Sequence, residues 1–362
     1  RDHAVGNTIV GMLESHDKSK FEIYGFYFGE NLDEKDLIHK KIVNTFDKFI
    51  NIKSMTDIKV AELSLELNID IAVDLTTHTG TENRFGIFTQ RCAPIQLNFL
   101  GYPGTSGSKS IDYIIADKTV IPKNNQKFYS EKIVYMPNSY HPIENIKKIS
   151  EKKFSRKELN LPEEKFIFCC FNSHQKITPS IFNIWIDLLK KNSNSVLWLR
   201  EFNQYSSKNL KLEASKKGLD EKRIIFAKRV PLDEHLVRIK NADLFLDTFP
   251  YTAHSTCSDV LRIGLPVLTF MGESFTSRVS ASFLHTMMIP ELITTSYEEY
   301  EKLANKIAND KDYLNNLKNK ILENKKKSPL YDIKLFTKNL EKAYFLMFEK
   351  YVKSEETNNI EI

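Results

Sequence analysis

Apolar runs of strand length alternate with segments of helical spacing along almost the whole chain. In its first part, strand-like runs occupy residues 21–28, 69–75, 95–100, 113–116 and 132–136. Residues 58–67 lie between two of these runs and have the apolar spacing of an amphipathic helix. Such alternation is typical of parallel strands joined by crossover helices, so we predict an α/β fold.

The alternation lapses near residues 138–163, where Pro142 and Pro162 stand among Lys, Glu and Ser. We interpret residues 141–162 as a linker between an N-terminal lobe, 1–140, and a C-terminal lobe, 163–330. Residues 331–362 are then a C-terminal helix and tail. The part after Ser354 is polar and is predicted to be frayed.

The alternation resumes in the second lobe. Its strand-like runs occupy residues 165–171, 195–199, 223–227, 243–246 and 266–270. Helical patterns occupy residues 179–191, 233–240, 297–309, 312–325 and 333–351, with further helices expected from about 206, 255 and 276. Two doubly wound domains in tandem would leave a cleft between them, with ligands at the carboxyl ends of the strands.

Charge and apolar content exclude several classes of protein. The 362 residues carry 52 basic and 47 acidic side chains, and these are interspersed, so charge gives no reason to expect nucleic-acid binding. The densest basic run, residues 325–327, fits the solvent face of a helix. No stretch of about 18 apolar residues occurs, so no membrane span is expected.

The four cysteines contain no C-x-x-C pair, which argues against a zinc ribbon. Cys169 and Cys170 lie inside an apolar run, and this usage fits a reducing, cytoplasmic location. No signal peptide is evident. The chain begins with Arg1 rather than Met, so we expect a fragment of a longer protein.

The stretch 242–259, ADLFLDTFPYTAHSTCSD, is the most informative for chemistry. An apolar strand ends there, and His254, Ser255 and Thr256 open a helix after a short loop. The N–H groups at a helix N-terminus suit a diphosphate, and Asp259, one turn in, could accept from ribose hydroxyls. A plain helix cap by Ser255 or Thr256 is the structural alternative.

A second polar stretch follows the buried strand at 165–171. It contains Asn172, Ser173 and Lys176, and it precedes a helix that begins near Pro179. Lys176 would lie at the carboxyl edge of the sheet, where an ammonium could balance the charge of a leaving nucleoside diphosphate without a metal. A solvated surface lysine is the alternative.

The loop GYPGTSG, residues 101–107, holds three glycines and a proline after a predicted strand. It is not a Walker A loop, because no Gly-Lys-Ser/Thr follows, and it could be only a structural turn. His3, His78, His141 and His235 are ambiguous in isolation. No histidine pair has the spacing of a helical metal site and no Asp-x-Asp follows a strand, so no metal is expected.

Several short motifs occur in a specific order: FLGYPGTSG, DYIIAD, MPNSY, FNSHQKITP, SVLWL, RIIFA, SDVL and SRVSAS. Each is weak, but the ordered set closely resembles the catalytic core of the O-linked N-acetylglucosamine transferase family, of the bacterial type. The match runs from Arg1 to about Tyr351. The resemblance implies a GT-B fold, in which two Rossmann-like lobes hold UDP-GlcNAc in the cleft between them.

The resemblance also implies an activity: inverting, metal-independent transfer of N-acetylglucosamine to Ser and Thr hydroxyls of acceptor proteins, with no cofactor. On this reading His3 falls on the family's active-site histidine, Lys176 on the lysine that contacts the diphosphate, and Gly101 on the loop that approaches the sugar. Asp74 is a lesser candidate for the base, and a phosphate oxygen of the substrate could also take the proton.

The remaining correspondences concern the nucleotide. The family's phosphate-binding turn corresponds to His254, Ser255 and Thr256, and its ribose-binding aspartate corresponds to Asp259. The nucleotide-side helix corresponds to His235 and Arg238. The position whose backbone reads the uracil edge corresponds to Val230. Asn172 belongs to the diphosphate motif. Two departures from the family are Leu232, where a lysine often packs on the uracil, and Ser173, where a glutamine is common.

The family's first strand and its tetratricopeptide-repeat array, which usually recruits acceptors, would precede Arg1. Three other functions stay open. The chain could use a different sugar donor or a polysaccharide or lipid-linked acceptor, it could bind UDP without transfer, or it could be a scaffold that acts through its C-terminal helices.

Overall fold

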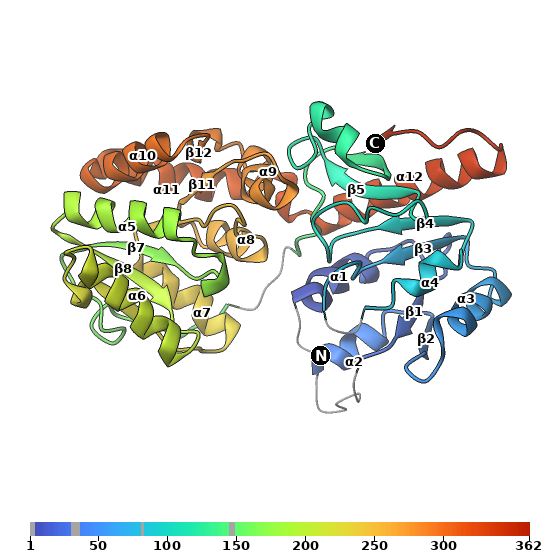
Figure 1. The fold of residues 1–362 in the computed structure, drawn as a ribbon, viewed down its shortest axis with the longest axis horizontal. Helices are drawn as coiled ribbons and strands as arrows, with labels where there is room; N and C mark the ends of the chain where they lie inside the picture. Colours follow the sequence, from blue (N-terminus) through green and yellow to red (C-terminus); the bar gives the residue numbers. More distant parts are fainter. Residues whose placement is uncertain (1–3, 30–36, 81–82, 145–148) are drawn as a thin grey trace. The chain divides into compact units, whose positions relative to one another are not determined.

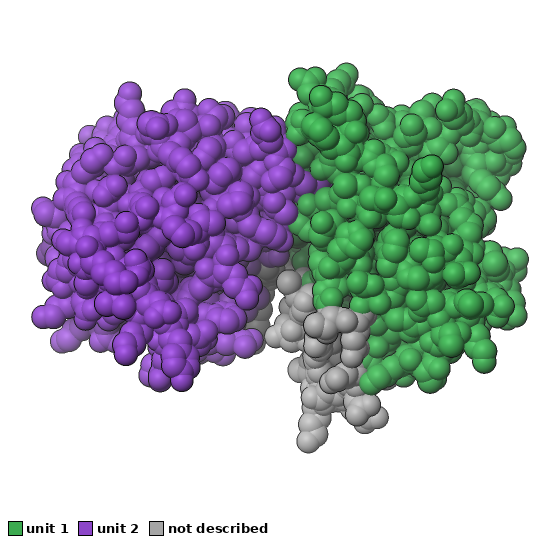
Figure 2. Space-filling view, viewed as in Figure 1, with its two compact units in different colours: residues 1–145, 329–362 green, residues 146–328 purple. Residues whose placement is uncertain are grey.

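The computed structural model describes residues 4–29, 37–80, 83–144 and 149–362 and divides the chain into two compact units (Figure 2). Unit 1 comprises Arg1–Asn145 and Pro329–Ile362, and unit 2 comprises Ile146–Ser328. The C-terminal segment therefore belongs to the same unit as the N-terminal residues. Every strand pairing found in the described residues is parallel, which confirms the predicted α/β class.

Unit 1 contains a five-stranded sheet in the order β13-β6-β5-β4-β3 and a separate pair, β1-β2. Its strands are β1 (Tyr24–Tyr27), β2 (Lys48–Asn51), β3 (Ile71–Asp74), β4 (Ile95–Asn98), β5 (Tyr113–Asp117), β6 (Lys132–Met136) and β13 (Ile360–Glu361). Five of these, β1, β3, β4, β5 and β6, confirm strands predicted from apolar runs. β2 was not predicted, because its sequence KFIN is short and only half apolar.

Two helices that are distant in sequence share the main core of unit 1. Helix α1 (Ala4–Glu14) packs against α12 (Ile333–Val352), and side chains such as Leu340 and Met347 lie in one buried cluster with Leu97. Figure 1 draws α12 in red beside the blue-to-green strands of this unit. The helix is thus part of the core of unit 1, although it follows unit 2 in the sequence.

Three shorter helices complete unit 1: α2 (Leu37–Val43), α3 (Asp57–Glu66) and α4 (Gly86–Thr89). Their region has a second, smaller core that includes Ile52, Val60 and Ile87. Helix α3 confirms the predicted helix at 58–67, and Thr56 caps it by accepting from the N–H of Lys59.

The prediction that the chain frays after Ser354 was wrong. Strand β13 pairs with β6, and Ile360 is 5% exposed. The Asn359 side-chain oxygen also accepts from the N–H of Ile133, at 2.8 Å. A polar composition did not predict this order, because the stabilising partner is a strand edge more than 200 residues earlier in the sequence.

Unit 2 contains a six-stranded parallel sheet in the order β12-β11-β10-β7-β8-β9. Its strands are β7 (Phe166–Cys170), β8 (Ser195–Arg200), β9 (Ile224–Ala227), β10 (Leu244–Leu246), β11 (Val267–Phe270) and β12 (Ile293–Thr294). The chain runs outward from β7 to β8 and β9, then returns to β10 on the other side of β7. The strand order therefore reverses between β7 and β10, where doubly wound sheets bind ligands.

The helices of unit 2 are α5 (Pro179–Lys191), α6 (Gln204–Lys216), α7 (Leu232–Arg238), α8 (Ser255–Arg262), α9 (Val279–Thr286), α10 (Tyr297–Asn309) and α11 (Lys311–Lys325). These confirm the predicted helices, with α9 starting three residues after the expected 276. Helix α5 packs against α10, and α8 packs against α9 and α11.

Candidate functional site

Two loops meet at the carboxyl edge of the unit 2 sheet, at the point where the strand order reverses. One follows β7 and the other follows β10. The side-chain amide of Asn172 joins them by donating to Asp247 Oδ1 at 3.0 Å and to Thr248 Oγ1 at 2.7 Å. Both amide hydrogens are thereby used, while the buried Asn172 Oδ1 accepts no hydrogen bond within the described residues. This oxygen can accept from a ligand.

The buried carboxylate of Asp247 holds the second loop in place. It accepts from the N–H groups of Thr248 and Ala253 at 2.8 and 2.7 Å, and from the Thr269 hydroxyl at 2.8 Å. Burial raises the pKa of Asp247, and these hydrogen bonds oppose that rise. Sequence analysis did not nominate Asp247, although a carboxylate directly after a buried strand is a signal that could have identified it.

Lys176 lies half-buried against this second loop. Its Nζ donates to the carbonyl of Thr252 at 2.9 Å and lies 3.9 Å from the ring centroid of Tyr251. The Tyr251 ring in turn stacks on His254, with centroids 4.9 Å apart. Burial lowers the pKa of Lys176 to about 8, against the opposing charge of Asp247. Sequence analysis missed Tyr251, because its place between two predicted residues depends on the fold of the loop.

Helix α8 begins immediately after this group. His254 occupies the N-cap position without a side-chain cap, so Ser255 and Thr256 are the first two helical residues rather than the cap. Their N–H groups donate to no group in the described part of the chain and lie at the positive end of the helix dipole. Asp259 is one turn further on and is 8% exposed. An anion placed here would meet unpaired donors.

Helix α7 carries a hydrogen-bonded pair, the half-buried His235 and the buried Arg238. The Arg238 Nε donates to His235 Nδ1 at 3.0 Å, and the His235 ring meets Phe171 edge-on at 4.8 Å. Burial and the neighbouring guanidinium lower the pKa of His235 to about 3, so the ring is neutral. Since Nδ1 accepts, the ring proton is on Nε2, which makes that nitrogen a hydrogen-bond donor.

Arg238 also fixes the loop that precedes α7. One guanidinium nitrogen donates to the carbonyl of Lys228 at 2.6 Å, and burial lowers the pKa of Arg238 to about 10. Val230 lies half-buried in this loop, and Leu232, the first residue of α7, is 48% exposed. His235 and Arg238 therefore orient the loop that contains Val230, which the family resemblance predicts to read the uracil edge.

A further arginine, missed by sequence analysis, contributes positive charge at the same sheet edge. Arg200 ends β8, and burial and the charge of Arg229 lower its pKa. The His174 ring, which follows β7, donates to the carbonyl of Arg200 and hydrogen-bonds Ser206 Oγ at 2.8 Å. Arg200 forms no ion pair in the described residues, so its charge is uncompensated. A dianionic ligand would compensate it.

Gly101 belongs to unit 1, as does Asp74, whereas the residues predicted to bind the nucleotide and its diphosphate belong to unit 2. A Cβ at Gly101 would lie 1.8 Å from the carbonyl oxygen of Leu75, so the backbone packing itself requires glycine. Its predicted approach to a sugar stays a prediction. His3 lies outside the described residues.

Polar groups also gather where β3 and β4 of unit 1 end. Asp74 Oδ1 accepts from the N–H groups of Thr76 and Thr77, each at 2.9 Å, whereas its buried Oδ2 has no hydrogen-bond partner in the described residues. The exposed His78 donates from Nε2 to the carbonyl of Ser106 at 2.9 Å, which leaves Nδ1 as an acceptor. Both Asp74 and His78 can take part in proton transfer.

Within the described residues, no three His, Cys, Asp or Glu side chains are grouped so that they could hold a metal ion. A helix apolar and long enough for a membrane span is likewise absent from that part of the chain.

The chain is similar to known proteins in sequence and in fold. The profile of glycosyl transferase family 41 matches residues 2–151 and 144–340. An Arabidopsis thaliana protein named probable UDP-N-acetylglucosamine–peptide N-acetylglucosaminyltransferase SEC is 30% identical over 368 residues. That alignment covers 100% of the present chain and 37% of the relative. The chain therefore spans little more than a third of that relative's length.

Solved structures give the fold. An O-GlcNAc transferase of Thermobaculum terrenum superposes with a TM-score of 0.89 at 25% identity, covering 98% of this chain and 66% of that one. Anabaena HepE, solved with UDP and glucose, superposes with a TM-score of 0.61 at 12% identity over 96% of this chain and 97% of that one. These neighbours are GT-B glycosyltransferases, so the predicted GT-B class with two Rossmann-like units is confirmed.

Proposed function

Because the chain belongs to glycosyl transferase family 41, we propose that it is the catalytic part of an enzyme that transfers N-acetylglucosamine from UDP-GlcNAc to Ser and Thr hydroxyls of proteins. The transfer inverts the anomeric centre and needs no metal or other cofactor. We place the reaction in the cytoplasm, since all four cysteines are free and buried. One observation carries the proposal: the unpaired N–H groups at the start of α8 and the half-buried ammonium of Lys176 lie where β7 and β10 end.

The diphosphate of the donor binds at the start of α8. The N–H groups and hydroxyls of Ser255 and Thr256 surround one side of it, and the ammonium of Lys176 neutralises the charge that develops as UDP leaves. Lys176 suits this role because Tyr251, Thr252 and Asp247 already hold it in position. A donor fixed before reaction stabilises a transition state without reorganisation.

The nucleoside occupies the neighbouring part of the same edge. Asp259 accepts from the ribose hydroxyls, and the backbone at Val230 reads the uracil edge. His235 and Arg238 orient that backbone. The Oδ1 atom of Asn172 accepts a hydrogen bond from the bound ligand.

The acceptor hydroxyl attacks the anomeric carbon from the face opposite UDP. The C–O bond to UDP breaks as the new glycosidic bond forms, and the hydroxyl proton must leave. His3 orients the hydroxyl or relays the proton. Asp74 or a phosphate oxygen of the donor could take it instead.

The first experiment incubates the complete gene product with isotopically labelled UDP-GlcNAc, host-cell extract and EDTA. Lys176→Ala serves as the inactive variant and Lys190→Ala, at an exposed position on α5, as its matched control. Labelled protein that survives EDTA, persists in Lys190→Ala and disappears in Lys176→Ala is the expected result.

Other outcomes would redirect the proposal. Tight UDP binding without labelled protein would overturn the proposed donor or acceptor, and a panel of UDP-sugars and polysaccharide acceptors would then identify the reaction. A folded sample that binds no UDP would refute the assignment of the donor site.

A further inference from the structure

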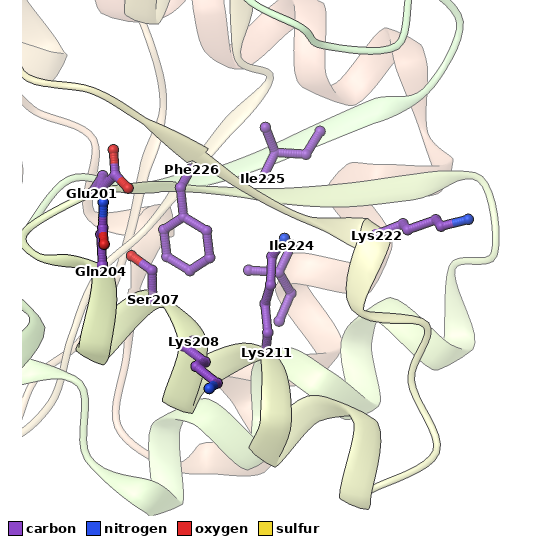
Figure 3. A pocket seen from close by; sticks show the side chains of 9 residues that line it. All are labelled: Glu201, Gln204, Ser207, Lys208, Lys211, Lys222, Ile224, Ile225 and Phe226. Atoms are coloured by element: carbon purple, nitrogen blue, oxygen red, sulfur yellow. The ribbon is translucent and has the colours of Figure 1, made fainter.

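A groove of about 550 Å³ lies beside strand β9. Helix α6 and the strand form its two sides (Figure 3). Its lining residues are Glu201, Gln204, Ser207, Lys208, Lys211, Lys222, Ile224, Ile225 and Phe226. None of these residues has a role in the proposed transfer, so the groove needs an explanation of its own.

The outer edge of β9 carries backbone groups that pair with no other strand. β9 is the last strand in its sheet and, among the residues that the structure describes, pairs only with β8. The N–H of Glu201 donates to the carbonyl of Ala227 at 2.8 Å, so Ala227 and Ile225 direct their peptide groups toward β8. By alternation, the peptide groups of Ile224 and Phe226 point outward.

Most of these outward groups are available. The N–H of Ile224 donates to the carbonyl of Glu221. The carbonyl of Ile224 and both the N–H and the carbonyl of Phe226 are therefore available to pair with an added strand. The side chains of Ile224 and Phe226 face α6, whereas Ile225 points to the opposite side of the sheet (Figure 3). Such an edge is a template for an added strand.

The side chains around this edge are predominantly cationic. The groove is lined by three lysines, Lys208, Lys211 and Lys222, and by a single carboxylate, that of Glu201. None of the three lysines forms an ion pair with a described residue. The Lys211 ammonium lies 6.0 Å from the ring centroid of Phe226. The groove therefore presents positive charge over an apolar floor.

A buried hydroxyl in the wall of the groove also has unused hydrogen-bonding capacity. Ser207 is 8% exposed, and its Oγ has no hydrogen-bond partner within the described residues. Buried polar atoms are normally paired, so the unsatisfied Oγ at the wall of a groove indicates a group that binds there.

We propose that the edge of β9 and helix α6 bind an extended acidic peptide segment, which adds to the sheet as a seventh strand. The peptide backbone pairs with the outward groups of Ile224 and Phe226. Alternate side chains face the groove, where carboxylates meet Lys208, Lys211 and Lys222. The intervening side chains lie on the side of Ile225 and are apolar.

The geometry favours a strand over a helix or a nucleic acid. A helix has already used its backbone donors and acceptors, so it would leave the β9 edge unpaired. A nucleic acid would need stacking platforms along the groove, and Phe226 is the one aromatic side chain in the lining. Two or three backbone hydrogen bonds with exposed ion pairs make a modest, salt-sensitive site.

The test uses the complete chain and a labelled, end-capped nonapeptide of alternating Glu and Val, with binding followed by fluorescence anisotropy. The double substitution Lys208→Glu and Lys211→Glu should weaken binding at least about tenfold, since two attractive pairs become repulsive. The matched control is Lys302→Glu, at an exposed position on α10. It should change the affinity less than about twofold.

Two further measurements distinguish strand addition from simple charge attraction. A nonapeptide of equal charge with alternate residues N-methylated should bind at least about tenfold more weakly, because it cannot pair along one edge. Hydrogen exchange of the Phe226 amide should slow when the unmethylated peptide binds.

Equal binding of the methylated peptide, or an unprotected Phe226 amide, would refute strand addition. A uridine oligonucleotide that binds at this groove while the Glu–Val peptide does not would refute the acidic peptide as ligand. UDP binding should be unchanged in the double variant, so failure here is distinguishable from failure of the proposed transfer.

Discussion

The side-chain amide of Asn172 donates to the buried carboxylate of Asp247 across 3.0 Å, and this bond connects the ends of β7 and β10. Asp247 also accepts from two N–H groups of the loop that leads to α8. One carboxylate therefore sets the relative positions of Lys176 and the helix N-terminus. The donor site depends on a residue that need not touch the donor.

Asp247→Ala should destabilise unit 2 strongly. The substitution leaves the donors of Thr248, Ala253 and Thr269 buried without an acceptor, and each such group costs about 1–3 kcal/mol. We expect a loss of at least about 3 kcal/mol in the free energy of unfolding, measured by urea denaturation. Asp187→Ala, at an exposed position on α5, should lose less than about 0.5 kcal/mol. Equal losses in the two variants would contradict this role.

Lys176→Ala should reduce turnover far more than stability. A preorganised donor at developing charge is worth roughly 10²–10³ in rate, whereas the side chain makes one hydrogen bond and one ring contact in the protein. Steady-state kinetics with UDP-GlcNAc and an acceptor protein, together with a thermal melt, separate the two effects. Near-normal turnover would remove Lys176 from the mechanism.

The pH dependence follows from the same lysine. Burial lowers its pKa to about 8, so the ammonium is present below that pH and is lost as pH rises through it. We expect kcat/KM for UDP-GlcNAc to fall above about pH 8, approaching tenfold per pH unit. The Lys176→Arg variant keeps its positive charge over this range, so its kcat/KM should not fall above pH 8. Its maximal kcat/KM should be lower than that of the unsubstituted protein. The same fall in both proteins would assign the titration to another group.

His235 should make the protein sensitive to acid. Its pKa is about 3 in the folded state and about 6.5 in an unfolded chain, so the unfolded state binds an extra proton between these values. Its contribution to stability is present above about pH 6.5 and is lost as pH falls toward 3, at up to about 1.4 kcal/mol per pH unit. Urea denaturation across this range should show that the free energy of unfolding falls less steeply with decreasing pH in His235→Gln than in the unsubstituted protein.

Two of the three glycines in the loop after β4, Gly101 and Gly104, should differ in their tolerance of a side chain. Gly101→Ala places a methyl group on the Leu75 carbonyl, and we expect a loss of about 1–3 kcal/mol or more. At Gly104 the nearest obstacle is the Tyr102 ring, 3.1 Å away, which can move. Gly104→Ala should therefore cost less than about 1 kcal/mol in a thermal melt. Equal costs would show that the Leu75 contact does not constrain the loop.

Much of the fold was predictable because it depends on local patterns. Apolar runs such as 132–136 coincide with strand β6, and helix α5 begins at Pro179 and ends at Lys191 as expected. Thr178 caps that helix and a proline occupies its first turn, and both are signals within a few residues.

The candidate site was only partly predictable. Residues such as Lys176 and Ser255 follow buried strands or open helices, so their places at the sheet edge follow from local sequence. Tyr251 carries no such signal, because its contact with Lys176 joins two different loops. Arg200 directly follows the predicted strand at 195–199, so its position at the sheet edge was open to prediction but was overlooked.

The sequence by itself therefore determined the α/β alternation, the family resemblance and the positions of the polar motifs, since each depends on short-range spacing. Only the tertiary structure decided that α12 and β13 complete unit 1, that Asp247 organises the donor loop, and that β9 has an open, basic edge. These features arise from contacts between distant segments, and the free energy of those contacts depends on packing that no local pattern encodes.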